Sequence, residues 1–407
     1  MTTILENTFR NPFKPGAGHM PPYLAGREKE KDEFLKLLNQ DLILGNLIIT
    51  GLRGTGKTVL LETLKPLAMQ GNWLWVGTDL SESASMSEET IAIRLLTDLS
   101  VVTSGIVIDH KQSIGFNFEN KGEEIRLDYG NLINFFTSQP GLIADKLKAT
   151  LELVWNTFGS QLATNGIIFT YDEAQNLSDH TEKGQYPLSL LLDVFQSIQR
   201  KGIPFMLLLV GLPTLFSKLV EVRTYSERMF RILELCKLSN EESKDAIVKP
   251  IEGSRCPVKF DNSSIEIIVR ESGGYPYFIQ FICREVYDLF LLQMARRVKP
   301  NVPISEIIAK LDSDFFSGRW MRATDRQKQL LAVIASLDNC EDEFTVHDLL
   351  DKMKNILRKP LSASHTNQML ASLIKNGLIH KNRHGKYSLA VPLLSRFISR
   401  QNINLQD

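Results

Sequence analysis

The residues best suited to chemistry lie in one eight-residue stretch, GLRGTGKT, at positions 51–58. Its spacing is G-x-x-x-x-G-K-[ST], in which the glycines let successive backbone N–H groups turn toward a phosphate chain. The lysine reaches the terminal phosphates, and the hydroxyl that follows it binds Mg²⁺. The stretch therefore predicts a site for ATP and Mg²⁺. Its expected nucleotide contacts are Gly51, Leu52, Arg53, Gly54, Thr55, Gly56, Lys57, Thr58 and Val59.

An acidic pair supplies the other half of such a site. Asp172 and Glu173 directly follow the apolar run IIFTY. We expect Asp172 to hold Mg²⁺ together with Thr58, and Glu173 to act with Lys57 in catalysis as the base that orients the attacking water. The letters DEAQ also resemble a helicase box. A two-lobed helicase would need a second domain ending in a QxxGRxxR-type segment, and the sequence contains none.

The apolar pattern around these motifs predicts the elements that position them. Short apolar runs indicate buried strands at 44–50, 72–81, 166–175 and 204–213, and amphipathic stretches indicate helices at 26–40 and 58–70. We expect Pro66 to kink or end the second helix. Strands that alternate with helices and are apolar throughout predict a parallel sheet with helices on both faces.

The chain divides into an expected series of domains. An extended segment (1–25) precedes an α/β core (26–225), a helical lid (226–300) and a C-terminal module (318–400). Within the core, alternating apolar residues predict an inserted β-hairpin near 111–130, with its turn at Asn120, Lys121 and Gly122. This hairpin is either a surface decoration or a finger that contacts a subunit or DNA.

Composition excludes several classes of protein. The 407 residues are 43% hydrophobic and 23% charged, as is typical of globular proteins, and no apolar run is long enough to cross a bilayer. Four cysteines without a CxxC pair imply neither a zinc site nor a disulfide framework. The first residues lack the pattern of a signal peptide. We therefore expect a cytoplasmic protein with no membrane partner.

The C-terminal module carries a positive charge and the outline of a winged helix-turn-helix. From Arg319 to Asp407 there are 14 Lys and Arg against 8 Asp and Glu, although the whole chain is neutral. Three helices are expected at 323–337, 344–354 and 361–377, followed by two strands within 378–392. In a DNA-binding version the third helix enters the major groove. The candidate DNA contacts are Ser364, His365, Asn367 and Gln368 on that helix, and Lys381, Arg383 and Lys386 on the wing.

Five segments, taken in order, carry a resemblance to a known family. They are PPYLAGREKE (21–30), the phosphate loop, YDEAQ (171–175), YSERMFRILELCKLSNEESKDAI (225–247) and GGYPYF (273–278). This order resembles AAA+ ATPases of the Orc1/Cdc6-like "archaeal ATPase" group, which is close to STAND ATPases and TniB-type transposition ATPases. The resemblance implies an α/β P-loop NTPase core with a helical lid and a C-terminal winged helix-turn-helix.

The resemblance also implies roles for particular residues. Tyr23, Arg27 and Pro276 would line the nucleotide pocket, and Arg228 or Arg231 would reach the ATP of a neighbouring subunit as an arginine finger. The sequence departs from the family at two sensor positions. The strand that ends at Val210 is followed by GLPT, with Gly211 and Thr214 in place of a plain polar sensor, and Tyr277 stands where many relatives have an arginine. We therefore expect slow hydrolysis that depends on assembly.

Two functions remain open at this point. One is an ATP-hydrolysing switch that forms nucleotide-dependent oligomers and acts on DNA in replication, transposition or defence against mobile elements. The other is a STAND-like signalling or scaffolding ATPase whose winged helix binds an unidentified protein partner. The third C-terminal helix has only Lys375 as a fixed charge, which keeps the second alternative open.

Overall fold

The computed structural model describes residues 10–16, 18–40, 45–105, 107–108, 125–159, 164–254, 258–383 and 385–403. The chain folds into two compact units whose sequences interleave. The sheet unit comprises Glu28–Thr50 and Leu60–Glu234, and the helical unit comprises Met1–Arg27, Gly51–Val59 and Leu235–Asp407. Each unit has its own hydrophobic core. The phosphate loop thus groups with the helical unit, although the strand that leads into it belongs to the sheet unit.

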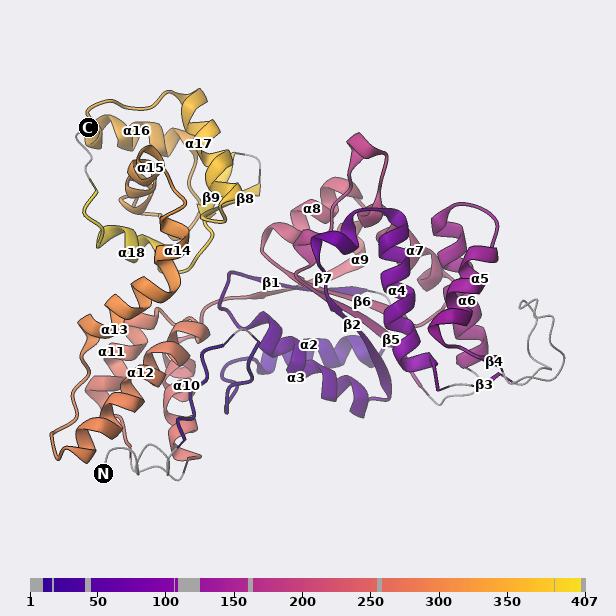
Figure 1. Ribbon diagram of the computed structural model, residues 1–407, viewed down its shortest axis with the longest axis horizontal. Coiled ribbons are helices and arrows are strands. Elements are labelled where there is room, and N and C mark those ends of the chain that lie inside the picture. The colour runs from indigo at the N-terminus through magenta and orange to yellow at the C-terminus, as the bar shows by residue number, and fades with distance from the viewer. Residues whose placement is uncertain are drawn as a thin grey trace. The chain divides into compact units, whose positions relative to one another are not determined.

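The sheet unit is built on a five-stranded sheet with the order β2-β5-β6-β1-β7 (Figure 1). Its strands are β1 (Asn46–Gly51), β2 (Trp73–Asp79), β5 (Gly166–Asp172), β6 (Phe205–Gly211) and β7 (Phe230–Leu235). The pairings β1–β6, β5–β6 and β2–β5 are all parallel. Every residue of β1, β5 and β6 is buried, as expected for a parallel sheet with both faces covered. The predicted α/β fold is confirmed.

Helices flank the sheet on both faces, with α2 and α3 on one side and α4 and α7 on the other (Figure 1). The helices of this part of the chain are α2 (Glu28–Leu38), α3 (Lys57–Gln70), α4 (Glu88–Thr103), α5 (Tyr129–Ser138), α6 (Ile143–Phe158), α7 (Pro187–Arg200), α8 (Thr214–Val222) and α9 (Ser226–Met229). Of the two expectations for Pro66, that it ends its helix was wrong, because α3 continues to Gln70, and that it kinks the helix stays a prediction. Leu64 and Ala68 are both buried, so packing on either side of Pro66 keeps the helix going despite one missing hydrogen bond.

The inserted hairpin is described only at its base. Strand β3 (Val107–Ile108) pairs antiparallel with β4 (Ile125–Arg126). The predicted hairpin near 111–130 stays a prediction, because residues 109–124 lie outside the described residues. The expected turn at Asn120, Lys121 and Gly122 lies outside the described residues.

The helical unit has a run of helices in the range where a lid was predicted, and their role as a lid stays a prediction. Its helices are α10 (Asn240–Glu252), α11 (Asn262–Ser272), α12 (Pro276–Ala295), α13 (Ile304–Leu311) and α14 (Ser317–Trp320). A π-helical turn (Asp312–Phe316) joins α13 directly to α14. The described residues before α2 form neither helix nor strand. Phe13 anchors this N-terminal segment in the core, where it is 2% exposed and its ring packs against Phe260 and Tyr287.

The C-terminal module has the element order predicted for a winged helix. It consists of α15 (Asp325–Ala335), α16 (Val346–Ile356), α17 (Ala363–Lys375), the antiparallel strands β8 (Ile379–Arg383) and β9 (Lys386–Leu389), and α18 (Leu394–Ser399). Thr324, Thr345 and Ser362 cap the first three helices with their side chains. His384, in the expected wing turn, lies outside the described residues, as does the side chain of Arg383.

Within the described part of the chain, no helix is both long and apolar enough to pass through a bilayer.

Candidate nucleotide site

The phosphate loop joins the end of β1 to the start of α3. Gly54 and Gly56 have φ angles of +82° and +90°, a region that residues with a Cβ rarely adopt. Lys57 Nζ donates hydrogen bonds to the carbonyl oxygens of Gly51, at 2.9 Å, and Leu52, at 3.0 Å. A bound phosphate would offer the same ammonium group charged acceptors, which form stronger hydrogen bonds than carbonyls do.

Arg27, which we expected in the nucleotide pocket, supports the backbone of the loop. Its side chain is buried, with 5% of the residue exposed. One terminal nitrogen donates to the carbonyl oxygens of Thr55 and Cys236, each at 3.0 Å. The guanidinium therefore connects the loop to the first residue after β7. A direct contact between Arg27 and a nucleotide stays a prediction.

The stretch GGYPYF closes on the loop through its backbone. The Tyr277 N–H, in the first turn of α12, donates to the Gly54 carbonyl oxygen at 3.1 Å. A Cβ at Gly54 would lie 3.0 Å from the Cβ of Tyr277, so only glycine fits this approach without displacement. The Leu238 N–H donates to the Gly274 carbonyl oxygen at 2.8 Å. The residue that departs from the family's arginine thus contacts the phosphate loop itself.

Tyr23 contacts a lysine of the lid. Lys249 Nζ lies 4.4 Å from the centre of the Tyr23 ring and donates to its hydroxyl at 2.8 Å. Hydrogen bonds to Asp245 and Tyr23 raise the pKa of Lys249. The contact of Tyr23 and Pro276 with an adenine base stays a prediction.

The acidic pair lies at the end of β5 in the sheet unit. Asp172 is buried, with 5% of the residue exposed, and its Oδ1 accepts a hydrogen bond from the Glu173 N–H at 2.7 Å. Glu173 is exposed and has a φ of +52°. A positive φ in a residue other than glycine is uncommon and is concentrated at functional sites. The backbone thus turns sharply at Glu173, so that Asp172 is buried while Glu173 is exposed.

Gln175, which the sequence analysis missed, links Glu173 to the end of β6. Its Nε2 donates a short hydrogen bond to Glu173 Oε2, and its Oε1 accepts from the Leu212 N–H at 3.2 Å. Its carbonyl oxygen accepts from Lys218 Nζ at 2.7 Å. A Cβ at Gly211 would lie 2.7 Å from Gln175 Oε1. The glycine at the expected sensor position therefore makes room for this amide.

The two arginine-finger candidates differ in their surroundings. Arg231 forms an ion pair with Glu33 of α2. Arg228 is exposed, and within the described residues it forms no ion pair. The structure therefore leaves Arg228 available to a second molecule, while Arg231 already has a carboxylate partner in its own chain.

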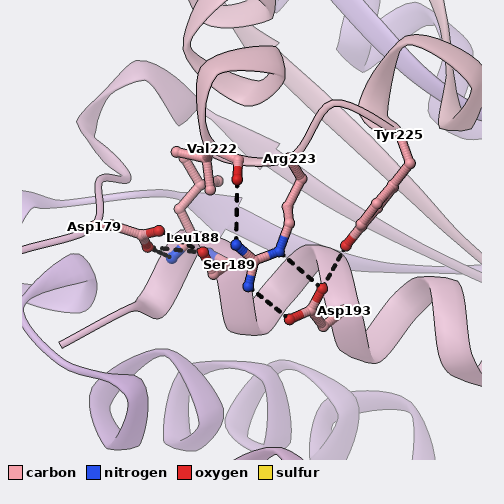
Figure 2. Close-up of polar contacts among 7 residues, drawn as sticks. All are labelled: Asp179, Leu188, Ser189, Asp193, Val222, Arg223 and Tyr225. Carbon is pink, nitrogen blue, oxygen red and sulfur yellow. Dashed lines mark hydrogen bonds and ion pairs between the residues drawn. The ribbon is translucent and has the colours of Figure 1, made fainter. Parts of the chain in front are cut away.

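A carboxylate on α7 anchors the segment that leads to Arg228 (Figure 2). Asp193 accepts hydrogen bonds from Arg223, at 3.2 and 3.0 Å, and from the Tyr225 hydroxyl at 2.5 Å. Burial opposes the ionisation of Asp193, but these hydrogen bonds outweigh it, and the pKa of Asp193 lies below its ordinary value. Nearby, Asp179 accepts from the backbone N–H groups of Leu188 and Ser189 at the start of α7. No sequence motif indicated the contacts of Asp193, because its partners lie about thirty residues away in the sequence.

The candidate DNA contacts on α17 lie on its exposed side. Ser364, His365, Asn367 and Gln368 are all exposed, whereas Thr366 and Met369 are buried. Asn367 Nδ2 donates to the Ala363 carbonyl oxygen of its own helix at 3.0 Å. Lys381 is exposed on β8, and Lys386 begins β9.

Comparisons with known proteins agree with this architecture. A family model described as a domain of unknown function, DUF8462, matches residues 313–398. No curated protein sequence matches the chain. Among solved structures, the ORC2 protein of Aeropyrum pernix is similar in its ADPNP–ADP complexes, with 15% identity, a TM-score of 0.52 and coverage of 95% of both chains. The ADP form of that protein has 17% identity, a TM-score of 0.53 and coverage of 95% of this chain and 97% of the other.

These likenesses define the class of the protein at the level of fold. The chain has an α/β fold built on a five-stranded sheet with a helical C-terminal region, and this fold is similar to that of the Aeropyrum pernix ORC2 protein. The likeness extends over nearly the whole chain, so the resemblance that the order of the motifs predicted is confirmed for the fold.

Proposed function

We propose that the protein binds and hydrolyses ATP and works as a molecular switch that acts with DNA. The observation that carries this proposal is the phosphate loop, in which Lys57 opens α3 directly after Gly54 and Gly56 have turned the backbone. Asp172, buried at the end of β5, would supply the carboxylate that such a site needs. The likeness to the Aeropyrum pernix ORC2 protein, solved with ADPNP and ADP, supports a nucleotide ligand.

Mg²⁺ fits the residues present. Within the described residues no group of three or more His, Cys, Asp or Glu could hold a metal ion alone. Mg²⁺ does not require one, because it is commonly bound through one or two protein oxygens together with nucleotide phosphates and water. The Thr58 hydroxyl and the Asp172 carboxylate would supply those oxygens. The ion would neutralise charge on the β- and γ-phosphates.

Three side chains would divide the work of hydrolysis. Lys57 would exchange its carbonyl partners for phosphate oxygens and stabilise the charge that develops there. Glu173 would orient the attacking water, in competition with Gln175 where the water approaches Oε2. Arg228 of a second copy would add a positive charge at the transferring phosphoryl group, so that hydrolysis depends on assembly.

The C-terminal module would carry the DNA contact. The surplus of positive charge after Arg319 favours phosphate binding, and the exposed polar residues of α17 offer hydrogen bonds to base edges. Lys381, Arg383 and Lys386 would contact phosphates. Replication, transposition or defence against mobile elements are processes in which such a switch would serve.

One observation favours a second function. Lys375 is the only Lys, Arg, Asp or Glu on α17. One positive charge is few for a helix that enters a DNA groove. A STAND-like ATPase whose C-terminal module binds a protein partner would need no further positive charge on this helix.

DNA binding under nucleotide control separates the two functions. Wild-type protein and Lys57→Ala would be titrated against a labelled duplex with ATP, with ADP and without nucleotide, at two salt concentrations. The switch predicts salt-sensitive binding that ATP strengthens in the wild type only. Assembly with ATP but no duplex affinity would favour the protein-binding function, and a wild type that binds no nucleotide would remove both.

A further inference from the structure

Gln175 is held at two points by the segment that follows β6. Its side-chain carbonyl oxygen accepts from the Leu212 N–H at 3.2 Å, and its main-chain carbonyl oxygen accepts from Lys218 Nζ of α8 at 2.7 Å. Its amide nitrogen is the group that donates to Glu173. All of these residues belong to the sheet unit. The contact between Gln175 and the proposed base therefore depends on the position of α8.

Lys218 directs a positive charge at this turn. Its side chain is partly buried, and within the described residues it forms no ion pair. Burial lowers the pKa of Lys218, and the carboxylates of Asp179 and Glu221 act in the opposite direction. A hydrogen bond from an ammonium group is stronger than one between two neutral groups. In the described part of the chain, the hydrogen bond of this charge therefore goes to the turn beside Glu173.

The turn that carries Gln175 is strained at Glu173. Glu173 has a φ of +52°, and a residue other than glycine keeps such a conformation only where surrounding contacts hold it. On the side of β2, Asn176 Nδ2 donates to the Leu80 carbonyl oxygen at 2.9 Å. On the side of α8, the turn is held through Gln175. Loss of the Lys218 contact would therefore loosen the turn on the side of α8 alone.

The same part of α8 contacts the helix that carries Arg228. Ser226 of α9 is buried, and its hydroxyl donates to the Leu219 carbonyl oxygen at 3.3 Å. Leu219 directly follows Lys218. The short segment between α8 and α9 is the one that Asp193 anchors (Figure 2). Through two consecutive residues, α8 thus contacts both the turn beside the proposed base and the helix of the proposed arginine finger.

We propose that α8 couples assembly to hydrolysis within one subunit. Lys218 keeps Gln175 on Glu173 Oε2 until a second copy engages Arg228, and a shift of α9 and α8 then frees this oxygen. The inference rests on the proposed function, since it assumes that Glu173 orients the attacking water and that Arg228 meets a second copy. Lys218 is a positioning residue, because it acts on Glu173 through Gln175. Coupling of this kind requires an element with two arrangements, and the strained turn at Glu173 is that element.

ATP hydrolysis at different protein concentrations tests the proposal. The proteins are wild type, Lys218→Met, Lys218→Arg and the control Lys201→Met, which removes a lysine paired with Glu152. Light scattering measures their assembly. Below the concentration of assembly, we expect Lys218→Met to raise kcat about threefold with KM unchanged, because the turn loosens. Above it, the kcat of this variant should equal that of wild type, since assembly has already shifted α8. Lys218→Arg should match wild type throughout, because its guanidinium donates to the same carbonyl oxygen.

Two further measurements separate this coupling from a general loss of structure. Below the concentration of assembly, Lys218→Met combined with Gln175→Leu should have a kcat within about twofold of Gln175→Leu alone, because the two residues act in one series. Hydrogen exchange of the amides at 174–177 should be faster in Lys218→Met than in Lys201→Met. Lys218→Gln, which keeps a polar end, replaces Lys218→Met if that variant does not fold.

The outcomes distinguish this proposal from the proposed function. An unchanged or lower kcat of Lys218→Met below the concentration of assembly would overturn the proposal. A threefold increase that persists at every concentration would overturn it too, because Lys218 would then hold the turn without any link to assembly. Independent effects of Lys218→Met and Gln175→Leu would show that Lys218 does not act through Gln175. In each of these cases hydrolysis by the wild type leaves the proposed function intact, whereas a wild type that hydrolyses no ATP at any concentration would remove both.

Discussion

At the residue scale, Gln175 holds Glu173 with one end of its amide and the end of β6 with the other. The same carboxylate oxygen cannot hold a water molecule in the same direction while it accepts from Gln175. The pair therefore describes a resting arrangement in which one acceptor direction of the proposed base is taken by Gln175. This gives a structural reason to expect slow hydrolysis, independent of the missing arginine at position 277.

Replacing the Gln175 side chain tests whether its contact with Glu173 slows hydrolysis. We expect Gln175→Leu to raise kcat about threefold to tenfold with KM unchanged, because the attacking water no longer competes at Glu173 Oε2 with a hydrogen bond worth about 1–2 kcal/mol. The variant should also lose about 1–2 kcal/mol of unfolding free energy, since the Leu212 N–H loses its acceptor. Steady-state ATPase assays and urea unfolding measure the two effects. A fall in kcat would show that Gln175 positions the base.

His380 predicts a pH dependence of stability. Its pKa is about 4 in the folded protein and about 6.5 when unfolded, so the unfolded chain binds more protons between these values. The unfolding free energy should therefore fall as pH decreases from about 6.5 to about 4, by roughly 3 kcal/mol from this group. Urea unfolding at several pH values should show a shallower decrease for His380→Gln. If the unfolding free energies of wild type and His380→Gln decrease with pH by the same amount, His380 is not the group responsible.

At the element scale, the short helix α9 carries Arg228, and Asp193 anchors the residues that precede it (Figure 2). Two side chains, Arg223 and Tyr225, converge on this carboxylate from one segment. A helix of four residues has little stability of its own. The direction in which Arg228 points therefore depends on α7, an element some thirty residues earlier in the chain.

Removing the anchor should loosen α9 without unfolding the sheet unit. We expect Asp193→Ala to cost about 1–2 kcal/mol of unfolding free energy, a modest effect because the carboxylate is partly exposed. Hydrogen exchange of the amides in α9 should accelerate, and ATP hydrolysis that depends on assembly should fall. Glu227→Ala, an exposed neighbour, is the control. Unchanged exchange in α9 would show that Asp193 does not hold it.

The exposed side of α17 allows a test of DNA contact at the same scale. We expect His365→Ala and Gln368→Ala each to weaken specific duplex binding by about 1–3 kcal/mol. Lys386→Ala should instead weaken binding to all sequences and reduce the slope of affinity against salt. Fluorescence anisotropy with duplexes of several sequences measures both. Full duplex affinity in all three variants would place the DNA contact elsewhere.

The sequence predicted the elements and motifs that depend on neighbouring residues. The loop at 51–58, the carboxylates after IIFTY and the caps of the C-terminal helices follow from short spacings. The sheet order could not be derived in this way, because it depends on which distant strands pair. The contacts of Gln175 with Leu212, of Arg231 with Glu33 and of Asp193 with Arg223 were missed for the same reason. Nor does any local pattern indicate the π-helical turn at Asp312–Phe316.

At the scale of the whole molecule, the interleaving of the two units places the phosphate loop in one unit and its supporting strand in the other. The chain leaves the sheet unit after Thr50 and returns to it at Leu60, and the loop lies in this short excursion. ATP that binds the folded state and not the unfolded state should raise the free energy of unfolding by about 2.7 kcal/mol when its concentration is one hundred times Kd. Thermal unfolding with and without ATP measures this, and Lys57→Ala should show no shift.

If Lys57 and Glu173 act together in ATP hydrolysis, as proposed, Glu173→Gln should separate ATP binding from hydrolysis. The measurement is single-turnover hydrolysis of ATP by wild type and variant at protein concentrations that allow assembly, alongside their ATP affinities. We predict that the variant binds ATP about as tightly as wild type and hydrolyses it at least about a hundredfold more slowly, because the attacking water loses its base. Hydrolysis by the variant at the wild-type rate would contradict the account.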